Sequence, residues 1–253
     1  MELKLSGLRA IVPASTKGIM RRVVEQLVDE GCNVAICSRS EDSVAKTLRE
    51  LSGGRGEVIG RACDVLDKED YESWIEEMVV QMGGVDIFIP GVSAGGGADS
   101  ERNWWKNFEV DVLSTVRGCE TVIPHMQDSG GGAITFVTTT ASVETFGGPQ
   151  AYNAMKGSLL VYAKQLSQEV GKDKIRVNCV SPGPIYFEGG SWEMLKDTMA
   201  KWFSKIERDH SEGCLGTPEE VANCIVFISS PAASWVSGTN MMVDGGFTKR
   251  VQF

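Results

Sequence analysis

The chain has 253 residues, which is long enough for one large domain with a substantial buried core. Its formal net charge is −9 and its sequence pI is about 4.9, with lysines and arginines dispersed along the chain. This charge argues against binding to nucleic acid or to an anionic membrane surface. The first seven residues lack the apolar core of a signal peptide, and no apolar stretch is long enough to span a bilayer. We therefore expect a cytoplasmic protein.

The cysteines and histidines give no sign of a disulfide framework or a metal site. The seven cysteines form no C-x-x-C pair, and most fall inside strand or helix patterns, as expected of small buried side chains in a reducing compartment. His125 and His210 have no metal-ligating neighbour at a useful spacing. We expect no metal ion.

The chain opens with the pattern of a strand, a loop and a helix. Residues 8–12 are apolar, residues 13–19 contain proline, hydroxyl and glycine residues, and apolar residues then repeat at helical spacing through residue 28. A second strand, over residues 32–37, is followed by Ser38, Arg39 and Ser40.

The residues after the second strand bear on the choice of nicotinamide cofactor. An acidic residue there would bind the free ribose of NAD, whereas an arginine accommodates the phosphate of NADP. This chain has Arg39 and no acid, and Lys17 supplies a second cation that could bracket a phosphate. The sequence therefore predicts NADP; the alternative is that both cations are merely solvated.

Strand and helix patterns continue to alternate through the middle of the chain. We expect helices over residues 41–51 and 71–82, strands over 57–65 and 85–89, and one long helix over 104–126. Three glycines then precede a β-rich run at 133–137, which ends in the hydroxyl cluster of Thr138, Thr139 and Thr140.

Tyr152 and Lys156 lie four residues apart at the start of an expected helix over residues 150–170. They would share one face of the helix, and the ammonium would lower the pKa of the phenol, so that the tyrosine could exchange a proton with a substrate oxygen. Taken alone, the pair equally fits an amphipathic helix with a lysine reaching for solvent. A strand over 175–180 follows, and ligands of parallel sheets bind at the carboxyl ends of such strands.

With these motifs the chain resembles the short-chain dehydrogenase/reductase family, in particular its ketoacyl-reductase-like members, over essentially its whole length. The resemblance implies an α/β fold with a doubly wound, Rossmann-type parallel sheet, as a single domain over residues 1–253. It also implies NADP-dependent interconversion of a carbonyl and an alcohol on a small-molecule substrate.

The resemblance also implies a set of cofactor contacts. The family loop T-G-x-x-x-G-x-G is eroded here: Gly18 matches, while Pro13, Ala14 and Met20 replace the threonine and two glycines. Ala14 is a small loss if its backbone angles are ordinary, whereas Met20 is a larger intrusion that could shift the helix. The family sequence N-N-A-G is replaced by residues 90–93, P-G-V-S. The expected cofactor contacts are Ser15, Thr16, Lys17, Gly18, Ile19, Arg39, Asp64, Val65, Gly91, Lys156, Pro182, Gly183 and Ile185, with Ser15 and Thr16 offering hydroxyls to phosphate.

By the same resemblance, Tyr152 would deliver the proton, and Lys156 would lower its pKa and hold the nicotinamide ribose. Thr139, thirteen residues before the tyrosine, would orient the substrate oxygen, with Ser142 as the nearby alternative. Asp111 stands where the family has an asparagine that holds a relay water. An aspartate there can pair with Lys156 but adds negative charge near the phenol, so its role stays open.

Residues 184–212 correspond to the variable substrate lid of the family. Phe187, Trp192 and Trp202 would form a hydrophobic wall, with Trp104 and Trp105 at the opposite rim, which favours a bulky apolar substrate. The alternative is that these aromatics pack a helix pair at a subunit contact. Residues 216–222 and 236–246 resemble the closing helix and last strand of the family, with Thr217 as N-cap and Pro218 at the first helical position. They suggest by analogy a homotetramer or dimer.

Two other functions remain open on the same fold. One is a lyase or dehalogenase without redox turnover, although the dehalogenase relatives have arginine in place of the lysine and a filled nucleotide pocket. The other is a non-catalytic binding or scaffold protein, suggested by the eroded loop, the turn at Gly91 and Asp111.

Overall fold

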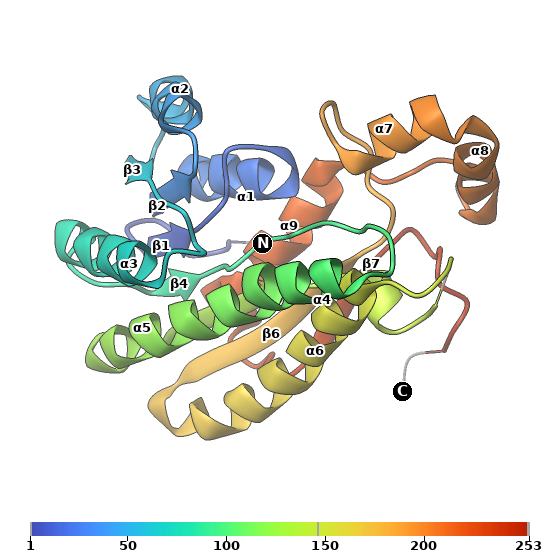
Figure 1. Cartoon of the computed structure of the whole chain (residues 1–253). Helices are drawn as coiled ribbons and strands as arrows, with labels where there is room; N and C mark the ends of the chain where they lie inside the picture. The colour runs from blue at the N-terminus through green and yellow to red at the C-terminus, as the bar shows by residue number, and fades with distance from the viewer. Residues whose placement is uncertain (1, 146, 252–253) are drawn as a thin grey trace.

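The computed structural model describes residues 2–145 and 147–251. Within them, seven strands form one parallel sheet in the order β3-β2-β1-β4-β5-β6-β7 (Figure 1). The order reverses between β1 and β4, which is where doubly wound sheets bind ligands. The strands are β1 (Arg9–Val12), β2 (Asn33–Ser38), β3 (Val58–Ala62), β4 (Ile87–Phe88), β5 (Gly132–Val137), β6 (Ile175–Pro182) and β7 (Asn240–Val243). The predicted doubly wound parallel fold is confirmed.

Helices cover both faces of this sheet (Figure 1). One apolar cluster joins the sheet to α1 (Gly18–Asp29), α2 (Glu41–Leu51) and α9 (Pro218–Ser229). A second cluster joins its other face to α3 (Lys68–Met82), α5 (Ser114–Asp128) and α6 (Ala151–Glu169). The division follows from strand geometry, since alternate side chains of a strand point to opposite faces. Ile11 thus joins the second cluster, while its neighbours Ala10 and Val12 join the first.

Side-chain caps fix the starts of several helices. Ser40 accepts a hydrogen bond from the backbone N–H of Ser43 at the start of α2, and Asp67 accepts one from Asp70 at the start of α3. The predicted N-cap Thr217 forms a capping box with Glu220, and Pro218 is the first helical residue of α9, as predicted. Helix α1 differs, because its N-cap Lys17 makes no side-chain cap.

The predicted long helix over residues 104–126 is a rod of three segments. The helix α4 (Glu101–Asn107) continues into a π-helical turn, η1 (Phe108–Leu113), and then into α5. Sequence periodicity does not reveal a π-turn, because the extra residue changes the rotation only locally. Asp111 lies inside this turn, and the turn packs against α6.

The segment of residues 184–212 stands off one end of the sheet and carries two helices (Figure 1). These are α7 (Ser191–Thr198) and α8 (Ala200–Asp209). The rings of Trp192 and Trp202 stack at 5.4 Å with their planes 6° apart, and thereby join the two helices. Among the described residues, no helix is long and apolar enough to cross a membrane.

Candidate active site

Tyr152 and Lys156 lie in the first turns of α6, close to where β4 and β5 end at the carboxyl edge of the sheet. Lys156 is 2% exposed. Its Nζ donates to the carbonyl of Val92, after β4, at 2.8 Å and to the carbonyl of Val137, at the end of β5, at 3.0 Å. The lysine therefore ties α6 to the ends of two neighbouring strands and does not reach for solvent.

Asp111 supplies the third oxygen around the ammonium. Its Oδ1 lies 3.1 Å from Nζ of Lys156, and the aspartate is completely buried. The backbone N–H of Ala94 approaches the carboxylate at 3.3 Å to Oδ2. Burial raises the pKa of Asp111 above its ordinary value, and the charge of Lys156 acts in the opposite direction. The pairing that the sequence allowed is thus present.

The environment of Tyr152 favours the protonated phenol. Burial raises its pKa to about 12, and the negative charge of Asp111 adds to the increase. Hydrogen bonds with Thr139 and Ser93 act in the opposite direction. That Lys156 lowers the pKa of Tyr152 stays a prediction; in this structure the ammonium is paired with a carboxylate and two carbonyls.

Hydroxyl groups surround the phenol. Thr139 is brought to Tyr152 as predicted, and it also caps the short 3-10 turn η2 (Thr140–Ser142) by accepting from the backbone N–H of Ala141. Ser93 was not among the predicted site residues; its place just after the fourth strand was the available signal. The Oγ1 of Thr140 and the Oγ of Ser142 are buried without a hydrogen-bond partner among the described residues.

Residues 13–20, called the 13–20 loop here, connect β1 to α1, include the first residues of that helix, and carry the predicted phosphate contacts. Ala14 adopts a left-handed conformation with φ of 54°, so its backbone angles are not ordinary. Ser15 is completely buried and donates its hydroxyl to the carbonyl of Val12 at 2.6 Å. The Ser15 hydroxyl is therefore already bonded inside the protein, and its contact with phosphate stays a prediction, whereas the half-buried Thr16 borders a cavity.

Two exposed cations flank this loop, Lys17 at the N-cap of α1 and Arg39 just after β2. In the part of the chain that the structure describes, neither makes an ion pair or a side-chain hydrogen bond. The first backbone N–H groups of α1 also lack a side-chain cap. This arrangement can receive an anion, because orphan N–H groups and unpaired cations both favour negative charge.

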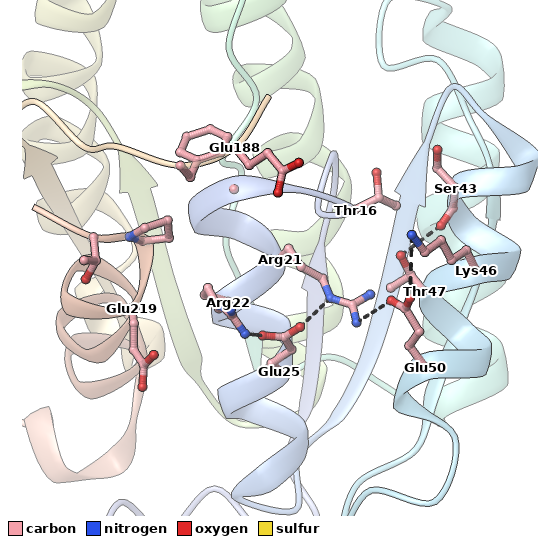
Figure 2. Close-up of a pocket in the computed structure, with 14 residues that line it drawn as sticks. Thr16, Arg21, Arg22, Glu25, Ser43, Lys46, Thr47, Glu50, Glu188 and Glu219 are labelled. Carbon is pink, nitrogen blue, oxygen red and sulfur yellow. Dashed lines mark hydrogen bonds and ion pairs between the residues drawn. The ribbon is translucent and has the colours of Figure 1, made fainter. Parts of the chain in front are cut away.

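A cavity of about 800 Å³ opens beside the loop, between α1, α2 and the chain around Glu188 (Figure 2). It excludes Tyr152 and Lys156 and is lined by Thr16, Gly18, Arg21, Arg22, Glu25, Ser43, Lys46, Thr47, Glu50, Phe187, Glu188, Thr217, Pro218 and Glu219. Figure 2 shows Arg21 reaching from α1 to both Glu25 and Glu50, so the cations that line this wall are largely neutralised, unlike Lys17 and Arg39.

The remaining predicted cofactor residues lie at the ends of β3, β4 and β6. Asp64 accepts from the backbone N–H of Leu66 at 3.1 Å, and Val65 is buried in the core. After β6, a Cβ at Gly183 would lie 2.7 Å from that of Asp244, so only glycine fits, and Ile185 is buried. Pro182 ends β6 itself, and Ile19 is half-buried in the first turn of α1.

The predicted substrate residues come from two parts of the chain, Ser142 from the η2 turn and Phe187, Trp192 and Trp202 from the 184–212 segment. A Cβ on Gly18 would lie 2.7 Å from the Phe187 ring, so Phe187 packs on the 13–20 loop. Trp192 and Trp202 stack on each other in the 184–212 segment. Of the predicted substrate residues, Ser142 is the one that lies in the same turn as Thr139, and this turn contacts α6. In residues 2–145 and 147–251, no group of three or more His, Cys, Asp or Glu side chains could hold a metal ion.

Comparisons with known proteins agree with this geometry. Residues 13–248 match the family model described as enoyl-(acyl carrier protein) reductase. Isoepoxydon dehydrogenase of Penicillium expansum is 32% identical, with 98% of each chain covered. Dehydrogenase/reductase SDR family member 4 of Bos taurus is 33% identical over 94% of this chain and 86% of its own length. These matches extend over nearly all of the sequence.

The chain belongs to the short-chain dehydrogenase/reductase family. Among solved structures, the L-sorbose reductase of Gluconobacter frateurii, complexed with NADPH and L-sorbose, has a TM-score of 0.90 at 29% identity. The alignment covers 99% of this chain and 100% of that one. Membership makes the chain an oxidoreductase of carbonyl and alcohol groups at the level of the family.

Within this short-chain dehydrogenase/reductase fold, two departures from the family pattern compensate each other. Met20 is 5% exposed and packs against Gly91, where an added Cβ would lie 2.1 Å from the Met20 sulfur. Met20 replaces a family glycine, and Gly91 stands within the family's N-N-A-G sequence. The methionine therefore fills space that a side chain at position 91 would need, and α1 still begins at Gly18.

Proposed function

We propose that this chain is an NADPH-dependent reductase that interconverts a carbonyl and an alcohol, with Tyr152 as the proton-transferring residue. The observation that carries the proposal is the assembly of Tyr152 with the Thr139 and Ser93 hydroxyls beside the buried Lys156. A phenol that keeps its proton at neutral pH can donate it to a carbonyl oxygen as that oxygen gains negative charge.

The residues around Tyr152 have different proposed roles, which follow from their positions. Thr139 and Ser93 share hydrogen bonds with the phenol, so either hydroxyl can also orient a substrate oxygen next to it. The Lys156 ammonium stabilises the phenolate that remains after proton transfer, even though its charge is shared with Asp111. The nicotinamide cofactor, when bound, supplies the hydride.

The choice of NADPH rests on the residues around the 13–20 loop. Lys17 and Arg39 are unpaired within the described chain, and residues 38–40, directly after β2, include no carboxylate, so a phosphate placed there would meet two cations. The uncapped start of α1 suits the pyrophosphate. The related L-sorbose reductase structure is likewise a complex with NADPH.

For the substrate, we propose a bulky apolar carbonyl compound covered by the 184–212 segment as a lid. Met194 and Met199 are 59% and 51% exposed in this segment, next to the stacked tryptophans, and so offer apolar surface to a ligand. A specific observation favours a second candidate, a polyhydroxy carbonyl compound. The buried hydroxyls of Thr140 and Ser142 lack partners in the described structure and could bind substrate hydroxyls.

We also propose that the chain works as a homo-oligomer, a tetramer or a dimer, in the cytoplasm. Large apolar side chains are exposed on α4, α6 and the approach to β7, with Trp105, Val161 and Trp235 at 60%, 61% and 98%. All seven cysteines are free, in keeping with a reducing compartment. Light scattering coupled to gel filtration measures the assembly, and a monomer at working concentrations would contradict it.

The function is tested by following NADPH oxidation against a panel of cyclic, aromatic, long-chain and sugar ketones. Wild type should reduce at least one ketone, and Tyr152→Phe should lose about 10²- to 10⁴-fold in kcat, as expected for an acid catalyst. NADPH affinity, from fluorescence titration, should be nearly the same in both. Absence of NADPH binding would favour a scaffold, and highest kcat/KM on sugars would favour the second substrate class.

A further inference from the structure

The ion pair of Asp111 and Lys156 is sealed inside the protein. Asp111 is 0% exposed and Lys156 is 2% exposed, and the two charged groups lie 3.1 Å apart. The three N–H groups of the ammonium match three oxygens, those of Asp111, Val92 and Val137. No ammonium N–H is therefore left over for the phenol of Tyr152 in this arrangement.

The position of Asp111 depends on the π-turn η1. This turn packs against α6, the helix that carries both Tyr152 and Lys156. The backbone N–H of Ala94 closes the remaining side of the carboxylate. Since both charges are buried and paired, they must be considered together, and as a pair they are neutral.

Few other titratable groups face this pair. Lys106, on α4, contributes positive charge near Asp111 while its Nζ donates to the carbonyl of Ala94 at 3.1 Å. From β6, the buried thiol of Cys179 lies within the influence of Lys156, and burial raises the pKa of that thiol to about 12. Thr139 and Ser93 contribute uncharged hydroxyls. Asp111 is thus the negative charge that acts on the phenol.

We propose that Asp111 is a positioning residue that takes up the charge of Lys156, keeps Tyr152 in its acid form, and thereby sets the site for carbonyl reduction while confining alcohol oxidation to alkaline pH. The inference rests on the proposed function. In reduction, the carbonyl carbon would take a hydride from NADPH, which becomes NADP⁺, the C=O π electron pair would take the proton of Tyr152 as the phenol O–H bond breaks, and a proton from solvent would then restore the phenol. In oxidation, the phenolate must be present first, because it accepts the alcohol proton.

The first test compares pH profiles of wild type and Asp111→Asn, which keeps the side-chain shape and removes the charge. In wild type, kcat/KM for alcohol oxidation with NADP⁺ should rise only at alkaline pH. In the variant this rise, and the alkaline decline of ketone reduction, should both move to lower pH by at least about one unit, because the ammonium then acts uncompensated. Asp111→Glu keeps the charge and should keep the wild-type midpoints. Unmoved midpoints in Asp111→Asn, or an equal shift in Asp111→Glu, would overturn the inference.

A second measurement needs neither cofactor nor turnover, and so separates this inference from the proposed function. The ultraviolet absorbance of phenolate is followed against pH in wild type and in Asp111→Asn. From each titration, the absorbance of the same protein carrying Tyr152→Phe is subtracted, which leaves the signal of Tyr152. Circular dichroism at every pH confirms that the chain stays folded. Tyr152 should ionise at lower pH in Asp111→Asn than in the chain with aspartate. Identical titrations would refute the role of Asp111, whatever the activity assays show.

Discussion

The surroundings of Tyr152 and the 13–20 loop lie at the same edge of the sheet but are held in different ways. Around Tyr152, a buried ammonium links a carboxylate and two strand-end carbonyls, so α6, η1, β4 and β5 share one polar network. The loop instead has a strained alanine and a helix start without a side-chain cap, and Lys17 and Arg39 beside it have no ion-pair partner among the described residues. The hydrogen bonds of the Lys156 ammonium are complete within the protein, whereas the loop leaves groups that a ligand can satisfy.

The largest expected effect breaks the complete network. Lys156→Met should lower the free energy of unfolding by about 3–5 kcal/mol, because it leaves Asp111 as an uncompensated buried carboxylate. The folded carboxyl then holds its proton more tightly than the unfolded one, so stability should fall as pH rises from acid to neutral. Urea unfolding at several pH values measures this. The matched control is Lys156→Met with Asp111→Asn, which should recover most of the loss; equal instability of the two would contradict the network.

The architecture was accessible from the sequence because it depends on local patterns. Apolar runs, helix periodicity and the cap at Thr217 are each encoded within a few residues, and the parallel sheet follows from their alternation. The approach of Thr139 to Tyr152 was also predicted, from spacing. The effect of Lys156 on the pKa of Tyr152 stays a prediction, because the sequence left open whether Asp111 would pair with the lysine; the structure shows that pair.

Other features needed three dimensions. Nothing in the local sequence indicates the π-turn that orients Asp111 or the left-handed backbone of Ala14. Met20 was predicted to intrude on the loop, because its packing against Gly91, a residue 71 positions later in the chain, is not visible in the local sequence. The packing of Phe187 on the 13–20 loop could not be predicted either, because it also joins residues far apart in the sequence.

The second prediction concerns the open region. Arg39→Ala should weaken NADPH binding by about 10- to 100-fold, which corresponds to the loss of hydrogen bonds to a charged group. NADH affinity should stay unchanged, because NADH lacks the ribose 2′-phosphate that Arg39 would bind. Paired fluorescence titrations measure both constants. Arg22→Ala is the control, because Arg22 is already paired with Glu25. If the substitution lowers the affinity for both nucleotides equally, or if wild type binds both with equal affinity, Arg39 does not bind the 2′-phosphate.

The third prediction tests whether the large side chain of Met20 depends on the absence of a side chain at Gly91. Gly91→Ala should cost about 1–3 kcal/mol, because the new Cβ would lie 2.1 Å from the Met20 sulfur. The same substitution in a Met20→Ala background should cost much less, since the smaller side chain makes room. Gly171→Ala, with open space around it, is the control and should be nearly neutral. Additive losses in the double variant would show that Met20 and Gly91 are independent.

The smallest expected effect comes from strain at a single residue. Ala14 has φ of 54°, a conformation that costs an L-residue about 1–2 kcal/mol and glycine almost nothing. Ala14→Gly should therefore stabilise the protein by about 0.5–1 kcal/mol, after the greater freedom of glycine in the unfolded chain is subtracted. The same change at Ala154, an exposed position inside α6, should instead destabilise by about 1 kcal/mol. Urea unfolding decides between the two signs. A loss of stability in Ala14→Gly would mean that the contacts of the Ala14 methyl group with the core stabilise the fold by more than the strain costs.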